Sequence, residues 1–235
     1  MAVYACSDLH GRIDLFKEIE KIIKPEDTVY FLGDAADRGP DGWELIKTIL
    51  RDSRFVYLKG NHEDMLVKAA KEWLEYDSID SAAWLLFYNG GEKTFEDFRN
   101  DNPDFQHKWI GMIDSLPEYK CYVNKNGETI HLSHSGFTYI ENENPEINDL
   151  IWNRTHIFDD KPIPDGHFIV HGHTPISSMR RRLPEVDSPL PGAFWYHNNS
   201  KCCIDNAAFN TGITCLLNLD TFDEEIIQIE YEENC

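Results

Sequence analysis

The sequence has no long apolar run. No stretch approaches the ~20 apolar residues that a membrane-spanning helix needs. The longest run near the start, Val3 to Cys6, is followed at once by charged residues, so a secretory leader with its apolar core of ~7–15 residues is not expected either. We therefore predict a cytoplasmic protein without a membrane partner.

Positive charge is also scarce. The 22 Lys and Arg residues stand against 42 Asp and Glu residues, which gives a formal net charge of −20 at pH 7. Such a surface repels phosphate backbones and anionic lipid, so nucleic acid and membranes are excluded as expected partners. The length of 235 residues and a hydrophobic share of 41% predict one globular domain over residues 1–235.

Cysteine pairs at metal-binding spacing are missing. The six cysteines show no C-x-x-C spacing and lie mostly in apolar surroundings, which argues against a disulfide framework or a thiolate zinc site. We expect buried free thiols. The cysteines are Cys6, Cys121, Cys202, Cys203, Cys215 and Cys235.

What is present is a threefold pattern in the first third of the chain. Three apolar runs, 3–6, 29–32 and 55–58, each end in a polar turn, and amphipathic stretches follow. This pattern predicts βαβ units and a buried parallel sheet in an α/β fold. Because parallel strands end at one edge of a sheet, all three turns should meet at its carboxyl edge.

The rest of the chain divides into a helical middle and a β-rich second half. A hairpin is expected from 119–123 and 129–133 across Asn124–Gly127. Prolines suggest a long surface loop over 183–200, and the acidic tail from Asp220 to Cys235 suggests a solvated edge strand. The remaining predicted helices are 64–76, 81–88 and 103–115, and the remaining strands are 168–170, 202–204, 213–219 and 226–231.

Five turns offer oxygen and nitrogen donors without sulfur. This mixture suits Mn, Fe or Zn, whereas Mg and Ca prefer oxygen alone. Six donors are enough for two metal ions if one carboxylate bridges, and Asp34, on the middle turn, is the natural bridge. The turns are Ser7–Gly11, Gly33–Gly39, Gly60–Glu63, His131–Gly136 and His171–Pro175, and the six donors are Asp8, His10, Asp34, Asn61, His134 and His173.

These turns resemble the motifs of the phosphoprotein phosphatase family of metallophosphoesterases. The match runs in order from Ser7 to Asp205 and is closest to the compact bacterial and bacteriophage-lambda type, which Asn89-Gly90-Gly91 and Ile151–Arg154 also resemble. The resemblance implies a β-sandwich flanked by helices, with a dinuclear centre that is commonly manganese. Ser7, in place of a glycine, and Asp205-Asn206-Ala207 depart from the family pattern without removing a ligand.

The resemblance also implies a role for each site residue. Asp8 and His10 match ligands of the first metal, Asp34 matches the bridge, and three further residues match ligands of the second metal. His62 matches the catalytic histidine, with Asp37 as its orienting partner. The second-metal ligands are Asn61, His134 and His173, and the phosphate-binding arginines are Arg38 and Arg154.

Elementary chemistry agrees with these roles. Two cations can share a water, lower its pKa and clamp a phosphoryl group for in-line attack. His62 directly follows a candidate ligand, so it can act as general acid, while Asp37 fixes its tautomer. Arg38 and Arg154 supply forked donors for the phosphoryl oxygens.

Other interpretations remain open for single residues. Taken one at a time, the aspartates of the turns could be helix N-caps. His171 could compete with His173 as the ligand, or could hold a ligand in place. The run Arg180-Arg181-Arg182 could bind an acidic phosphopeptide, although a solvated loop is the preferred interpretation.

We expect a metal-dependent phosphomonoester hydrolase, specifically a protein serine/threonine phosphatase that uses a water activated by two metal ions. The alternative enzyme is a dinucleoside polyphosphate hydrolase, because a similar catalytic set serves that substrate. A non-catalytic scaffold that binds phosphoproteins is a third hypothesis, and it would require a lost ligand or acid.

Overall fold

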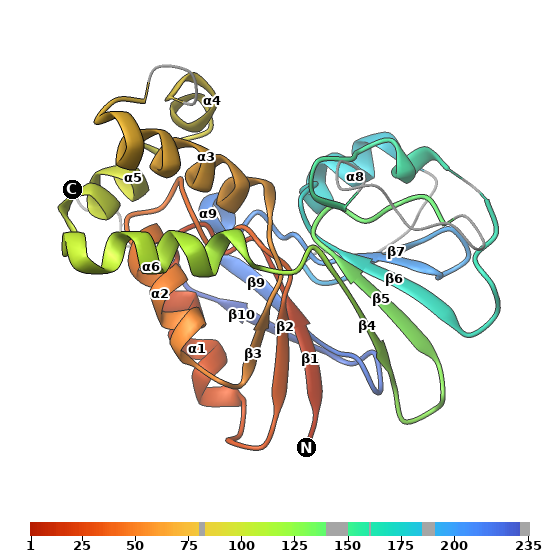
Figure 1. Ribbon diagram of the computed structural model, residues 1–235. Coiled ribbons are helices and arrows are strands. Elements are labelled where there is room, and N and C mark those ends of the chain that lie inside the picture. The colour runs from red at the N-terminus through yellow and green to blue at the C-terminus, as the bar shows by residue number, and fades with distance from the viewer. Residues whose placement is uncertain (80–82, 140–149, 160, 185–190, 231–235) are drawn as a thin grey trace.

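The computed structural model describes residues 1–79, 83–139, 150–159, 161–184 and 191–230, and it contains two five-stranded sheets. The strand order is β10-β9-β1-β2-β3 in the first sheet and β4-β5-β6-β8-β7 in the second (Figure 1). The first sheet comprises β1 (Val3–Cys6), β2 (Thr28–Phe31), β3 (Phe55–Tyr57), β9 (Ile213–Asn218) and β10 (Glu224–Gln228). The second comprises β4 (Tyr119–Val123), β5 (Thr129–Ser133), β6 (His167–His171), β7 (Phe194–Tyr196) and β8 (Lys201–Cys203).

The predicted parallel unit is confirmed in the first sheet. Strands β1, β2 and β3 pair in parallel, so the turns that follow them share one edge. The antiparallel strand β10 closes the other side as a largely exposed edge strand, as the acidic tail predicts. In β10 the inward side chain is Ile227, while Ile226 faces solvent.

Helices cover one face of the first sheet, because their apolar residues recur at helical spacing. In Figure 1 they lie together on the side of this sheet away from the second sheet. One of them, α5, was not predicted. These helices are α1 (Ile13–Ile22), α2 (Gly42–Arg51), α3 (Asn61–Tyr76), α4 (Ala83–Tyr88), α5 (Glu92–Asn100) and α6 (Pro103–Asp114).

The region 183–200 differs from the predicted surface loop. Residues 194–196 form β7, which pairs with β8, and Phe194 and Tyr196 are buried. Burial of these aromatic side chains against the sheet outweighs the local turn signal of the prolines. Residues 185–190 of the predicted loop lie outside the described part of the chain.

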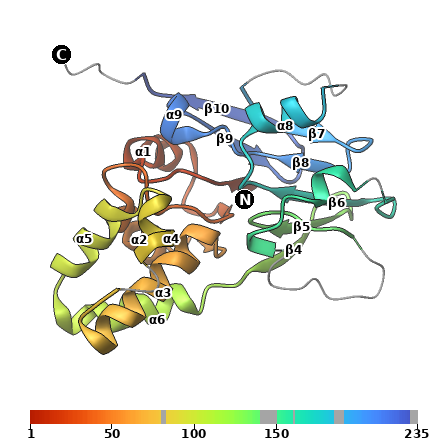
Figure 2. The same cartoon turned by 90° about the horizontal axis from the view of Figure 1, so that it is seen from above.

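The two sheets pack face to face and share a core. Buried residues of β1 and β9, such as Ala5 and Leu217, belong to the same cluster as Leu132 of β5 and Val170 of β6. The predicted α/β sandwich flanked by helices is therefore confirmed. Figure 2 shows the same two-part arrangement from above, with the shorter helices α8 (Ile176–Arg182) and α9 (Ala208–Thr211) beside the later strands.

Four cysteines are buried as expected, and Cys121 is exposed; none of the five cysteines in the described ranges forms a disulfide. Within the residues that the structure describes, no helix is long and apolar enough to cross a membrane.

Candidate active site

The three glycine-bearing turns of the first sheet contact one another through their backbones. Asp8 N–H donates to the carbonyl of Gly33 at 3.1 Å, and His10 N–H donates to that of Asp34 at 2.9 Å. Gly33 has φ +93°, and a Cβ at this position would lie 2.6 Å from backbone atoms of Gly60. The turns can therefore approach this closely only with glycine at these positions.

Several site residues have left-handed backbone conformations. Left-handed φ is uncommon outside glycine and costs free energy, so its concentration in turns of the two sheets that contact one another indicates a functional site. The predicted site residues with positive φ are Asp8, His10, Asp34, Asp37, Arg38 and His173.

Asp34 lies at the centre of the cluster. Its Oδ1 is 3.4 Å from Nε2 of His134, and its Oδ2 is 3.6 Å from Nε2 of His10 and 3.8 Å from Nε2 of His62. Two groups of buried donors therefore share this carboxylate: His10 and His62 on one side, His134 and His173 on the other. A carboxylate whose two oxygens face two donor groups has the geometry of a bridge between two cations.

Backbone carbonyls fix the tautomers of two histidines. Nδ1–H of His134 donates to the carbonyl of Leu32 at 2.7 Å, and Nδ1–H of His10 donates to that of Ala36 at 2.8 Å. Their Nε2 atoms consequently point into the cluster. Nε2 of His134 lies 2.9 Å from Oδ1 of Asn61 and 3.2 Å from Nδ1 of His173. This arrangement suits a bound cation.

The pKa shifts of Asp34 and His134 favour a positive charge between them, whereas burial lowers the pKa of His10 and of His173 well below the usual value. Although burial opposes it, the carboxylate of Asp34 raises the pKa of His134 to about 10. Burial acts against ionisation of Asp34, yet the neighbouring imidazoles hold its pKa well below the usual range. A buried anion of this kind is stable only beside cations.

His62 lies beside Asp37, the residue expected as its orienting partner. Its Nδ1 lies 2.7 Å from Oδ2 of Asp37, and both side chains are buried. The backbone N–H of Asp37 in turn donates to Oγ1 of Thr94 on α5 at 2.9 Å. The unpredicted helix α5 thus helps to position the partner of His62, and no sequence signal distinguished Thr94.

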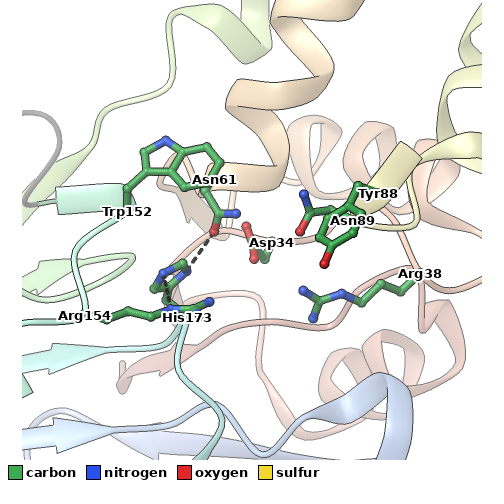
Figure 3. A pocket seen from close by; sticks show the side chains of 8 residues that line it. All are labelled: Asp34, Arg38, Asn61, Tyr88, Asn89, Trp152, Arg154 and His173. Atoms are coloured by element: carbon green, nitrogen blue, oxygen red, sulfur yellow. Dashed lines mark hydrogen bonds between the residues drawn. The ribbon is translucent and has the colours of Figure 1, made fainter. Parts of the chain in front are cut away.

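Two arginines reach the same cluster from opposite halves of the molecule. Nη1 of Arg38 donates to Nε2 of His10 at 2.8 Å, and Nε of Arg154 donates to Nε2 of His173 at 3.0 Å. Figure 3 shows both guanidinium groups beside Asp34. They contribute to a pocket of about 350 Å³, lined by Asp34, Arg38, Asn61, Tyr88, Asn89, Trp152, Arg154 and His173. The sequence interpretation did not include Tyr88 or Trp152 in this pocket.

Asp8 lies beside the cluster rather than in either donor group. Both of its carboxylate oxygens accept the backbone N–H of His173 at 3.1 Å, which joins the first sheet to a turn of the second. Burial raises its pKa to about 6. The assignment of Asp8 to the first metal remains a prediction.

His171 is hydrogen-bonded through both ring nitrogens. Nδ1–H donates to the carbonyl of Gly172 at 3.0 Å, so Nε2 accepts from the hydroxyl of Tyr196 at 2.7 Å. Neither nitrogen is directed at Asp34, which favours His173 over His171 as the candidate ligand. The run Arg180–Arg182 is the last turn of α8, not a loop.

Glu63 is a structural centre of the site that the sequence interpretation passed over. Its carboxylate accepts backbone N–H bonds from Asp34, Ala35, Ala36 and Gly60 at 2.8–3.2 Å, and the Tyr57 hydroxyl at 2.8 Å. It is the third residue of α3, the capping-box position, so its place in the helix could have indicated this role.

Replacing Glu63 by glutamine should destabilise the fold. The amide nitrogen would face N–H donors that now bond a carboxylate, and we expect a loss of about 3 kcal/mol in the free energy of unfolding. Urea denaturation with a chelator present measures this loss. The exposed Glu18→Gln, which loses only an ion pair with Lys21, should change stability by less than about 0.5 kcal/mol. Equal effects for the two variants would contradict the role of Glu63.

Comparison with known proteins agrees with this geometry. The serine/threonine-protein phosphatase 1 of Salmonella typhimurium is 26% identical over 189 residues, which cover 77% of this chain and 81% of that protein. The symmetrical bis(5'-nucleosyl)-tetraphosphatase of Delftia acidovorans is 24% identical over 180 residues, covering 74% of this chain and 58% of that protein. A metallophosphoesterase from Sphaerobacter thermophilus has a similar fold, with a TM-score of 0.56 and 15% identity over 99% of this chain and 90% of that one.

The predicted resemblance to the phosphoprotein phosphatases is confirmed by the Salmonella relative together with a family match. A family model described as calcineurin-like phosphoesterase matches residues 1–204. That match contains all five donor-bearing turns and both arginines of the pocket. The chain belongs to the calcineurin-like phosphoesterase family.

Proposed function

We propose that this protein hydrolyses phosphomonoesters at a centre of two divalent metal ions. The observation that supports this most is the carboxylate of Asp34, whose two oxygens face two separate groups of buried donors. Asp34 and His173 line a pocket to which two arginines also contribute. This combination provides places for two cations and for the phosphoryl oxygens of a substrate.

The residues fit such a metal pair. The donors are carboxylate, amide and imidazole, and Nε2 of His134 is turned toward Oδ1 of Asp34 and Oδ1 of Asn61. We propose that Asp8, His10 and Asp34 bind one ion. Asp34, Asn61, His134 and His173 bind the other. The mixture of imidazole and oxygen donors favours manganese, iron or zinc over magnesium, and the family resemblance supports manganese among these. When bound, the two ions would supply an activated water and neutralise phosphoryl charge.

The remaining roles belong to side chains around that centre. Arg38 and Arg154 bind the phosphoryl oxygens from the two sides of the pocket. His62 donates a proton from Nε2 to the departing oxygen, while its Nδ1–H is held by Oδ2 of Asp37 at 2.7 Å. Because Asp37 is buried, it holds the imidazole in one orientation.

For the substrate we propose phosphoserine or phosphothreonine in proteins. The Salmonella relative, which this chain matches over most of both lengths, supports this choice. A dinucleoside tetraphosphate is the second candidate, supported by the relatives that bear that name. The single domain over 1–235, the cytoplasmic location and the lack of nucleic-acid or membrane partners remain predictions.

The deciding experiment compares the two substrates on one enzyme preparation. Values of kcat/KM are measured for a phosphoserine peptide and for a dinucleoside tetraphosphate under the same manganese concentration. We expect a higher kcat/KM for the phosphoserine peptide. Preference for the dinucleotide would support the second candidate. If neither substrate nor p-nitrophenyl phosphate is hydrolysed, the protein is a non-catalytic scaffold instead.

Arg154→Ala should weaken inhibition by inorganic phosphate. Loss of a charged, forked donor to phosphate corresponds to about 10–100-fold in the inhibition constant. Metal content should be unchanged. The matched control is Arg181→Ala, because Arg181 is exposed and its side chain bonds Ser178. Unchanged phosphate inhibition in Arg154→Ala would assign Arg154 to the solvated surface instead.

A further inference from the structure

Lys201 is a buried lysine in the middle of the second sheet. It lies on β8 between β6 and β7, and only 1% of the residue is exposed. Lysine is rarely buried to this extent, because its ammonium group loses hydration unless other groups replace the water. The sequence gives no sign of this burial, and the catalytic proposal above does not use the residue.

Two backbone carbonyls replace that water. Nζ of Lys201 donates to the carbonyl of His156 at 3.0 Å and to the carbonyl of Asp159 at 3.1 Å. These carbonyls lie at the start of the short 3-10 helix η1 (His156–Phe158) and directly after its end. One side chain thus fixes both ends of a turn that begins two residues after Arg154.

The same turn is packed tightly from its other side. The ring of His156 is fully buried and meets the ring of His171 edge-on, with centroids 4.9 Å apart. A Cβ on Gly136 would lie 2.7 Å from Nε2 of His156, so the ring can approach this segment so closely only because the residue is glycine. The turn is therefore confined between the segment of His171 and the segment that follows His134.

From these contacts we infer that Lys201 is a positioning residue for Arg154, holding the turn from which the arginine reaches the phosphate pocket. Arg154 itself is exposed, and its side chain bonds His173 through Nε at 3.0 Å, so the position of its backbone determines from where the guanidinium reaches the pocket. A guanidinium that is displaced by even a fraction of an ångström loses forked geometry toward phosphate. The inference rests on the proposed role of Arg154.

The test is a double-mutant cycle on inhibition by inorganic phosphate. Lys201→Met keeps the length of the side chain but leaves both carbonyls without their donor. We expect about a tenfold weaker inhibition constant, with metal content unchanged. In an Arg154→Ala background the same substitution should have no further effect, because the residue that it positions is absent.

The matched control is Tyr196→Phe. It removes one buried hydrogen bond from the neighbouring His171 but none from the turn that follows Arg154. Phosphate inhibition should then stay within about twofold, even though stability falls by about 1 kcal/mol. If Lys201→Met does not fold, the double-mutant cycle is repeated with Lys201→Gln. The amide of this glutamine can still donate to one carbonyl.

The outcomes separate the two proposals. If Arg154→Ala itself leaves phosphate inhibition unchanged, the proposed phosphate site is wrong. If Arg154→Ala weakens inhibition but the Lys201 variant does not, the phosphate site stands and only the positioning role of Lys201 is wrong. Additive effects in the double variant, or an equal effect of Tyr196→Phe, would also overturn it, because either result means that Lys201 acts on stability alone.

Discussion

Replacing Asp34 by asparagine is expected to abolish hydrolysis and to strip metal from the protein. Its Oδ1 and Oδ2 face different donor groups, so the loss of its charge affects both proposed cations at once. Removal of even an outer partner of a metal ligand reduces metal affinity about 10–100-fold, and loss of the bridge should exceed that. Elemental analysis and phosphate release on the same sample measure both effects.

The control for this variant is Asp41→Asn, a carboxylate seven residues further along the chain that is in neither donor group. It should retain metal and activity. If the Asp34→Asn protein kept its metal and hydrolysed substrate at the normal rate, Asp34 would not be a bridging ligand.

Replacing His62 by asparagine should slow the enzyme by an amount that depends on the leaving group. A serine alkoxide departs poorly without a proton, whereas nitrophenolate departs almost unaided. General acid catalysis contributes about 10²–10⁴-fold, so we expect a loss of that size on a phosphoserine peptide and less than about tenfold on p-nitrophenyl phosphate. Asp37→Asn should follow the same trend more weakly, because it leaves the imidazole present but less well oriented.

The measurement is the ratio of the two rate losses, with metal content determined in parallel. Since His62 also lies in the donor group of His10 and Asp34, the alternative role is that of a ligand. A ligand variant would lose metal and slow both substrates equally, and that pattern would reassign His62. The exposed His107→Asn serves as a neutral control.

The site could be predicted because its residues follow strand ends that the sequence marks clearly. Apolar runs before Asp8, Asp34 and Asn61 predict three parallel strands, and the structure brings their turns together through Gly33 and Gly60. Local pattern is sufficient here because sheet topology alone determines which turns become neighbours.

Other features depend on contacts that are distant in sequence. The helix α5 follows two glycines and is stabilised by burial of Phe95 and Phe98, not by a strong local signal. Strand β7 lies in a proline-rich stretch and forms because β8 offers it a partner. A lysine such as Lys201 is expected on the surface. In the structure it is buried, because two carbonyls of the turn that follows Arg154 accept its hydrogen bonds.

A metal titration shows whether two metal ions share Asp34. Chelated protein is titrated with manganese while p-nitrophenyl phosphate hydrolysis and bound metal are followed together. We expect no activity before addition, a rate that saturates at two equivalents per chain, and weaker rescue by magnesium because of the imidazole donors. Full activity in a chain that carries no divalent metal, or saturation at one equivalent, would contradict it.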